Sequence, residues 1–261
     1  MAEQLITQQG DLLYQALLDR RPIAPLTESH PGLTIEQAYR IQEHMVGRRL
    51  ATGSRVVGKK IGVTSQAVMD MLGVHQPDFG YLLDDMMLAS GADIALDTLI
   101  QPKAEGEIAF LLKKDLQGPG ISVAEVYAAT EGVLACFEIV DSRIRDWQIK
   151  IQDTVADNAS CGVFVLGDRL VDPRHLDLST CGMVLEQNGE VAVTGAGAAA
   201  LGAPAAAVAW LANQLGRLGT PLKAGEIVLS GALAAMVPIR SACDLRLSIG
   251  GLGSCEVRFH A

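Results

Sequence analysis

The chain has 261 residues, of which 49% are hydrophobic and 20% charged, an ordinary balance for a globular protein that buries a substantial core. Its formal net charge is -9, and lysine and arginine form no cluster along the sequence. This charge excludes nucleic acid and anionic membrane surfaces as expected partners, because both recruit proteins through basic patches. A small anionic substrate stays compatible, since a local metal ion would attract it.

The cysteines and the N-terminal residues predict a cytoplasmic protein. Five cysteines are widely scattered without a C-x-x-C pair, so buried free thiols in a reducing compartment are expected. The first residues contain neither a basic region nor a long apolar stretch, and we expect no secretory signal. Residues 195–212 come nearest to a membrane span, but glycine and proline interrupt them and most of their apolar residues are alanine.

Two helices are predicted at the start of the chain. A leucine stripe runs through residues 3–20, and a following proline ends this helix because it disfavours helical geometry at the residue before it. Thr34 and Gln37 have the spacing of a capping box, so a second helix is predicted from there to about residue 52. We expect these helices, within residues 1–54, to form a small N-terminal cap.

The next segment is predicted to place a lysine in an open position on a strand. In the strand expected over residues 55–62, Lys60 shares its face only with glycines, which leaves room beside it for a ligand. The alternative is an ordinary surface lysine. A short helix over 65–72 and a turn-rich loop over 75–80 follow. Asp78 lies in that loop, where an aspartate after proline commonly caps a turn.

Two acidic residues then occupy alternate positions of a strand predicted over 105–113. Glu105 and Glu107 therefore project from the same face, where they repel one another and lose hydration if the face is buried. Glu138 lies within a strongly apolar strand predicted over 132–141, and a buried carboxylate needs a partner. A divalent cation would serve all three, because carboxylate oxygens are hard ligands. The alternative for the first pair is a solvated edge strand.

The second half of the chain is predicted to be mostly β-structure. Residues 142–160 are polar and irregular, and long loops of this kind are often functional. Asn188 and Gly189 indicate a type I′ hairpin turn, and Pro204 suits the start of a helix. Strands are predicted over 161–166, 182–187, 190–194, 226–231, 244–249 and 254–259. This mixture predicts an α+β fold in which residues 55–261 form a β-rich core, in a single folding unit with the cap.

Six stretches together resemble one family of enzymes, and the resemblance covers nearly the whole chain. They are residues 57–65, 73–81, 101–109, 138–144, 155–162 and 225–231. The chain resembles the fumarylacetoacetate hydrolase superfamily, and within it the 2-oxopent-4-enoate (2-hydroxypenta-2,4-dienoate) hydratases of the catechol meta-cleavage pathway. The resemblance implies a mixed β-roll or β-sandwich core, homo-oligomeric assembly and one Mg²⁺ or Mn²⁺ ion per subunit.

The resemblance also implies a role for each candidate site residue. The positions that match the family's metal ligands are Glu105, Glu107 and Glu138. The implied reaction hydrates 2-hydroxypenta-2,4-dienoate to 4-hydroxy-2-oxopentanoate, by protonation at C5 and addition of water at C4. Lys60 would stabilise the C2 oxygen or the carboxylate as a cation, and Asp78 would transfer protons and activate water. Ser160 is implied as a substrate-binding residue, whereas on the sequence alone it reads as structural.

Three alternatives compete with hydration. The decarboxylases that act on 2-oxo-3-hexenedioate (4-oxalocrotonate) resemble the chain almost as broadly, but typically lack an aspartate at the position of Asp78. Hydrolysis of acylpyruvates uses a His/Glu dyad in a segment that this chain does not match. A non-catalytic structural partner of the decarboxylase is the third, and the presence of Lys60 beside the acidic trio argues against it. A hydratase in complex with 4-oxalocrotonate decarboxylase is also compatible with the sequence.

Overall fold

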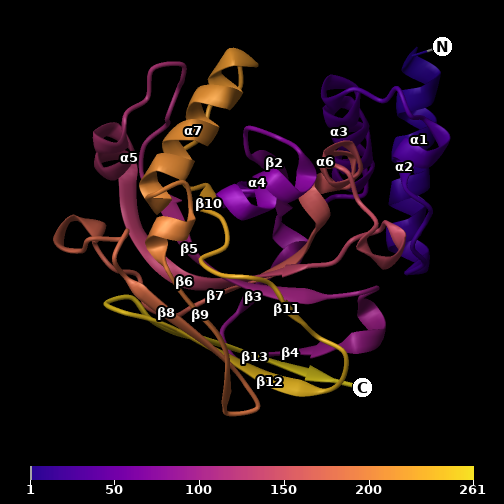
Figure 1. The fold of residues 1–261 in the computed structure, drawn as a ribbon. Helices are drawn as coiled ribbons and strands as arrows, with labels where there is room; N and C mark the ends of the chain where they lie inside the picture. Colours follow the sequence, from indigo (N-terminus) through magenta and orange to yellow (C-terminus); the bar gives the residue numbers. More distant parts are fainter. Residues whose placement is uncertain (1) are drawn as a thin grey trace.

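Two β-sheets packed face to face form the centre of the protein in the computed structural model, which describes residues 2–261 (Figure 1). The larger, eight-stranded sheet has the order β2-β1-β10-β5-β6-β7-β3, with β11 paired to β5. Its strands are β1 (Val56–Gly62), β2 (Asp78–Leu83), β3 (Met87–Ala89), β5 (Lys103–Leu112), β6 (Thr130–Val140), β7 (Cys161–Leu166), β10 (Ile227–Leu229) and β11 (Val237–Pro238). The smaller sheet, in the order β4-β13-β12-β8-β9, comprises β4 (Ala92–Ala95), β8 (Gly182–Gln187), β9 (Glu190–Ala196), β12 (Cys243–Ile249) and β13 (Gly253–His260).

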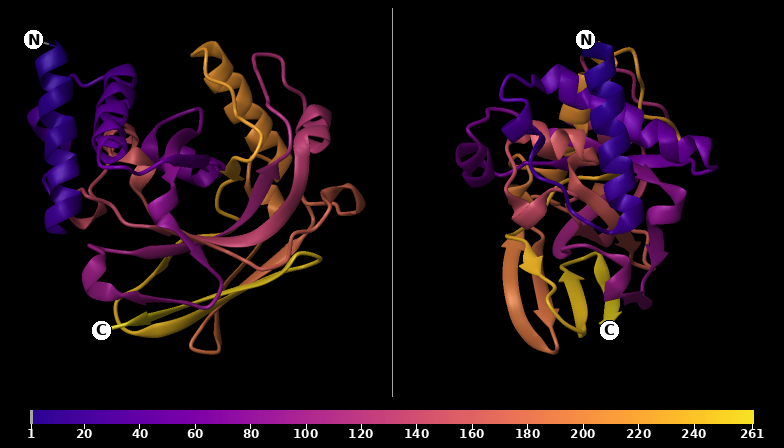
Figure 2. Two further views of the ribbon diagram at one scale, coloured as in Figure 1. Left: turned by 180° about the vertical axis from the view of Figure 1, so that it is seen from behind. Right: turned by 90° about the vertical axis from the view of Figure 1, so that its right-hand side faces the viewer.

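The helices lie on the side of the larger sheet that faces away from the smaller one (Figures 1 and 2). They are α1 (Ala2–Asp19), α2 (Leu26–Ser29), α3 (Ile35–Ala51), α4 (Gln66–Leu72), α5 (Val123–Ala129), α6 (Ile151–Ala156) and α7 (Pro204–Arg217). Single 3-10 turns cover Asp84–Met86, Leu96–Thr98, Arg145–Trp147, Asn158–Ser160, Pro173–His175 and Gly197–Ala199. The predicted capping box opens α3, where the Thr34 hydroxyl accepts a hydrogen bond from the Gln37 amide at 3.2 Å. The predicted α+β fold is confirmed.

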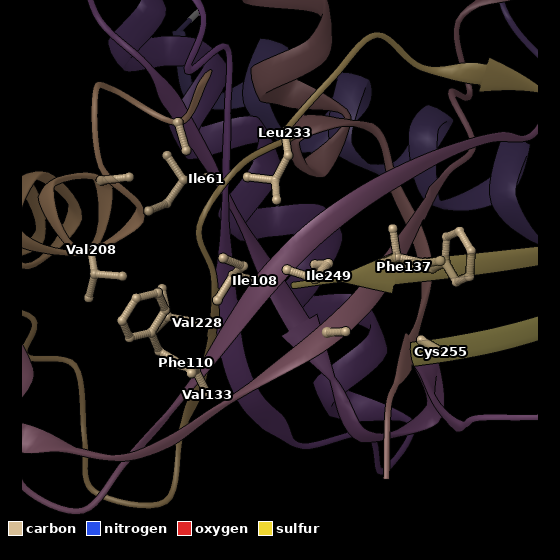
Figure 3. Packing of buried hydrophobic residues seen from close by; sticks show 14 of the residues in the cluster. Ile61, Ile108, Phe110, Val133, Phe137, Val208, Val228, Leu233, Ile249 and Cys255 are labelled. Atoms are coloured by element: carbon tan, nitrogen blue, oxygen red, sulfur yellow. The ribbon is translucent and has the colours of Figure 1, made fainter. Parts of the chain in front are cut away.

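The larger sheet is strongly curled, since β2 and β7 contact one another although they are not neighbours in the strand order. Leu82, Phe164 and Leu229 pack in one cluster of the curled sheet. A second cluster joins the two sheets and includes Phe137 of β6 and Ile249 of β12 (Figure 3). The curled sheet and the sandwich beneath it correspond to the expected β-roll or sandwich core.

The first three helices pack on the segment between β6 and β7. Leu13 of α1 and Ile41 of α3 are fully buried and share a cluster with Ile151 and Val155 of α6. These helices therefore contact the rest of the protein largely through residues that follow strand β6. This attachment places α3 and α6 beside the segment that carries Ser160.

Helix α7 belongs to the main core. Within the described chain, the stretch Gly197–Arg217 has the length and apolar composition of a membrane span. Half of its most apolar 18-residue segment is buried inside the protein. Val208 lies fully buried in the cluster between the sheets and the helix (Figure 3). A core helix has this composition because every face that packs on other elements is apolar.

Two sequence predictions about local structure are wrong. Asp78, expected in a loop, is the first residue of β2, where it is paired with Gly62 of β1. Residues 142–160, expected to be an irregular loop, contain α6 and two 3-10 turns, and most of their polar side chains are buried. The predictions also lacked the short strands β3 and β4.

Gly106 lies on β5 between the two acids and faces the smaller sheet. A Cβ atom built on it would lie 2.7 Å from Leu247 Cδ1 and 3.3 Å from Met183 Sδ. A glycine is therefore required for the two sheets to approach closely here, and the neighbouring glutamates project from the opposite face.

We expect Gly106→Ala to lower the free energy of unfolding by about 1–3 kcal/mol, because the added methyl group overpacks the contact between the sheets. Urea denaturation measures this loss. Gly182→Ala, on a strand of the same sandwich but with nothing within 4 Å of the added Cβ, is the matched control and should change the stability little. Equal stabilities of the two variants would contradict this account of Gly106.

Candidate functional site

Three carboxylates converge on one face of the hairpin formed by β5 and β6. Glu105 and Glu138 lie directly opposite each other in the antiparallel register, and Glu107 follows two residues later on the same face. Their oxygen atoms can all lie within 4.8 Å of one another. Glu107 and Glu138 are fully buried, whereas Glu105 is half-buried and reaches the adjacent cavity.

The protein's own groups leave this cluster short of partners. Gly231 N donates to Glu107 Oε2 at 2.7 Å and Lys60 Nζ forms an ion pair with Glu138 Oε1 at 3.1 Å, but Glu107 Oε1 and Glu138 Oε2 have no partner among the described residues. Burial, reinforced by the charge of Glu138, raises the pKa of Glu105 to about 7 and that of Glu107 well above its usual range. Hard oxygen ligands with free lone pairs fit a divalent cation, which would replace the missing partners. Three protein ligands would leave coordination positions open, as in catalytic sites.

Lys60 of β1 lies against the cluster. Its Nζ is 3.1 Å from Glu138 Oε1 and donates to the backbone carbonyl of Ala159 at 3.1 Å. Burial opposes the charge of this lysine, but Glu138 and the other nearby acids outweigh it and raise the pKa, so the ammonium form persists at neutral pH. The surface-lysine alternative is wrong, since only 3% of Lys60 is exposed.

Asp78 lies beside Lys60 at the first position of β2. The carboxylate is buried, and its Oδ1 atom has no hydrogen-bond partner. A Cβ atom on the facing Gly62 would come within 2.3 Å of that oxygen, so the glycine provides the space that Asp78 occupies. Burial raises the pKa of Asp78 against the opposing charge of Lys60. A carboxyl with a raised pKa keeps its proton more readily than an exposed aspartate, as a general acid requires.

Ser160 lies at the end of the 3-10 turn that precedes β7, and it lines the same cavity as Lys60. Its hydroxyl is 3.2 Å from Thr154 Oγ1 and donates to Asp157 Oδ2 at 3.2 Å. Asp157 in turn forms a buried ion pair with Arg143 at 2.5 Å. The structure thus brings Ser160 to the site, but its hydroxyl already has protein partners.

A cavity of about 460 Å³ opens above these residues. Its charged lining consists of Lys60, Asp78 and Glu105, and most of the remaining lining is apolar. The apolar lining includes Val68, Met71 and Leu72 of α4, Trp147, Ile149, Ala232, Ala234, Ala235 and Met236. The arrangement can hold an anionic, oxygen-rich group at the charged end and a hydrocarbon group along the walls.

The sequence did not indicate the walls of the cavity. Trp147 lines the cavity and donates from Nε1 to the Gln101 carbonyl at 3.0 Å. Met71 and Met236 are far apart in the sequence, and no local pattern links them. His75, three residues before Asp78, is exposed and does not line the cavity.

Comparisons with known proteins give consistent results. The family model described as fumarylacetoacetate (FAA) hydrolase C-terminal matches residues 55–260. The chain is 58% identical over 259 residues to 2-hydroxyhexa-2,4-dienoate hydratase of Comamonas testosteroni, with 98% of each chain covered. It is 62% identical over 220 residues to 2-hydroxypent-2,4-dienoate hydratase of Pseudomonas putida, covering 84% of this chain and 99% of the relative. The structure of 4-oxalocrotonate decarboxylase from Pseudomonas putida G7, complexed with magnesium and adipate, is similar with a TM-score of 0.95 and 37% identity, over 99% of this chain and 98% of that one.

We expect the purified protein to bind about one divalent cation per chain at the three glutamates. Cation at about 100 times its Kd should stabilise the fold by about 2.7 kcal/mol, and Glu107→Gln should abolish most of this gain by removing an unpartnered buried ligand. Calorimetric titration and thermal unfolding measure both effects. Glu256→Gln, at an exposed position of β13, is the control and should bind the cation like the unaltered protein.

We also expect the cation-free protein to lose stability as the pH rises. The pKa of Glu105 lies at about 7 in the folded state and at the ordinary 4.5 in the unfolded state, so the folded protein holds the extra proton between these values. The associated stability is present below about pH 4.5 and is lost as the pH passes through about 7. Urea midpoints of cation-free protein at about pH 5 and about pH 8 measure the change. Glu105→Gln should show a smaller decline, and an equal decline would contradict the assignment.

Proposed function

The chain belongs to the fumarylacetoacetate hydrolase family, and on that premise we propose that it is a metal-dependent hydratase of 2-hydroxypenta-2,4-dienoate. Water addition would give 4-hydroxy-2-oxopentanoate. One observation carries the proposal: three carboxylates, two of them with unpartnered buried oxygens, lie beside Lys60 and Asp78 at the charged end of an apolar cavity. The hydratase names of relatives at 58% and 62% identity support the same reaction.

Different residues of the chain would bind different parts of the substrate. Glu105, Glu107 and Glu138 would hold the divalent cation, which when bound supplies an electrophile for the 2-oxo acid end of the substrate. The Lys60 ammonium adds a fixed positive charge where negative charge develops on the C2 oxygen. The apolar walls hold the hydrocarbon part of the dienoate and keep water away except at the position where it reacts.

Asp78 would move the protons. In its protonated form it donates to C5 while the 2-hydroxyl releases its proton to solvent, which converts the dienol into a ketone with a double bond between C3 and C4. As a carboxylate it then accepts a proton from the water whose oxygen bonds to C4, and C3 takes up a proton from solvent. Its burial and raised pKa suit a group that must alternate between the two forms.

The cavity favours hydration over the decarboxylase alternative. The second carboxylate of 2-oxo-3-hexenedioate would extend away from the cation site, and Lys60 is the one cationic residue among the described lining. An unpaired carboxylate against apolar walls is costly to desolvate. The monocarboxylate dienoate has no such group. The family resemblance associates an aspartate at the position of Asp78 with the hydratase branch, and Asp78 lines the same cavity as Lys60.

Several finer points stay predictions. The family resemblance is the basis for Mg²⁺ or Mn²⁺ as the ion, for homo-oligomeric assembly and for a complex with 4-oxalocrotonate decarboxylase. The cysteine pattern is the basis for a cytoplasmic location. The similar decarboxylase structures contain magnesium in one case and calcium in another, which supports a divalent cation for this chain without selecting one.

We expect the protein with a divalent cation to hydrate 2-hydroxypenta-2,4-dienoate, seen as loss of its ultraviolet absorbance and as 4-hydroxy-2-oxopentanoate in the product spectrum. Asp78→Asn should lower kcat by about 100-fold or more, because removal of a general acid–base group costs that much. Asp70→Asn, on the exposed side of α4, is the matched control and should keep full activity. Release of CO₂ from 2-oxo-3-hexenedioate with no hydration of the dienoate would assign the decarboxylase function instead.

A further inference from the structure

The turn that carries Ala159 has an unusual backbone. Asn158, Ala159 and Ser160 are three consecutive non-glycine residues with positive φ angles of 54°, 50° and 55°. Residues other than glycine adopt this left-handed region rarely and usually singly, because Cβ approaches the following carbonyl oxygen. Strain of this kind persists only where surrounding contacts enforce it, and it concentrates at functional sites.

The Asn158 side chain is one of the contacts that enforce the turn. Its Oδ1 accepts a hydrogen bond from Tyr81 N at 2.8 Å, and its Nδ2 donates to Tyr81 O at 2.9 Å. The amide thus satisfies both backbone groups of one residue of β2, which is the edge strand of its sheet. A Cβ atom on Gly80 would lie 2.5 Å from the Asn158 carbonyl oxygen, so the turn rests directly on the strand.

The other end of the turn is also anchored. Asp157 accepts hydrogen bonds from the Ser160 backbone and hydroxyl, and its carboxylate pairs with the buried Arg143. Within the turn, the Ala159 carbonyl accepts a hydrogen bond from Lys60 Nζ at 3.1 Å, whereas the carbonyls of Asp157 and Cys161 on either side of the turn accept from Arg143. The left-handed conformation therefore directs one carbonyl at the ammonium group.

We propose that Asn158 is a positioning residue whose amide, by holding the left-handed turn 158–160 on β2, fixes the ammonium group of Lys60 in the site. Lys60 has two polar partners within the described chain, Glu138 on one side and the Ala159 carbonyl on the other. Without the Ala159 carbonyl, the flexible side chain of Lys60 would keep only its contact with Glu138, and a bound cation would also contact that carboxylate. Asn158 touches Tyr81 and does not line the cavity, so it acts through Lys60.

The kinetic part of this inference rests on the proposed hydratase function, whereas the position of the ammonium group can be observed without turnover. Asn158→Gly removes the amide and keeps a backbone that tolerates positive φ. Asn188→Gly is the matched control, because Asn188 also has a positive φ of 54° but lies in the exposed turn between β8 and β9. Gly80→Ala is a second variant that displaces the same turn from the opposite side while leaving Asn158 intact.

The experiment records the side-chain ammonium signals of ¹⁵N-labelled protein at low temperature, together with kcat and KM for the dienoate. Lys59 serves as an internal reference, since it is buried and its Nζ pairs with Glu226 at 2.9 Å. The two signals are assigned by their loss in Lys60→Met and Lys59→Met. Thermal unfolding confirms that each variant is folded.

We expect Asn158→Gly and Gly80→Ala to broaden or remove the Lys60 signal and to leave the Lys59 signal in place. Their kcat should fall about tenfold or more with KM changed less than about twofold, because the lost contact acts on charge that develops during the reaction. Asn188→Gly should match the unaltered protein in every readout. A folded Asn158→Gly protein with an unchanged Lys60 signal would overturn the inference. If the unaltered protein does not hydrate the dienoate but Asn158→Gly still loses the Lys60 signal, the positioning role is supported and the proposed function is overturned.

Discussion

The arrangement of the site depends on a pairing that a β-sheet ordinarily avoids: two glutamates directly opposite each other on adjacent antiparallel strands. Glu105 and Glu138 face one another across β5 and β6, and Glu107 adds a third carboxylate on the same buried face. Like charges in such positions destabilise a sheet, and burial increases the cost. The single lysine ammonium beside Glu138 balances one of three charges. A divalent cation is the simplest group that makes this face of the sheet favourable.

The rest of the fold holds that face in a closed environment. Below the site, Gly106 lets the second sheet pack directly against β5. Around it, the curl of the larger sheet brings β1 and β2 to the same side as the site. Strand β1, which carries Lys60, pairs in parallel with the short strand β10, and β2, which carries Asp78, pairs antiparallel with β1. Above it, α4 and the segment 232–236 provide apolar walls. Each element thus either supplies a charge or excludes water from the charges.

The sequence predicted the parts of this site that follow strand periodicity. Alternation along a strand was enough to place Glu105 and Glu107 on one face, and the glycine pattern around Lys60 indicated an open position that Asp78 now occupies. The position of Asp78 itself was misassigned because proline, aspartate and glycine within residues 75–80 favour a turn locally. Gly80 instead serves a tertiary contact with the Asn158 backbone, which no local pattern reveals.

The prediction for the polar segment 142–160 is wrong for a related reason. Its polar composition predicts an irregular loop, yet Arg143 and Asp157 are both fully buried and satisfy each other and the surrounding backbone. Buried polar groups are stable where they are hydrogen-bonded. The periodicity of the sequence does not reveal that Arg143 and Asp157, which are 14 residues apart, pair with each other.

The central claim is that the carboxylate trio holds a divalent cation, and crystals of the protein grown with Mn²⁺ test it most directly. Anomalous diffraction should show one strong peak within ligand distance of the carboxylate oxygens of Glu105, Glu107 and Glu138. A fully occupied peak elsewhere, with the three carboxylates pairing only with protein groups, would contradict the account.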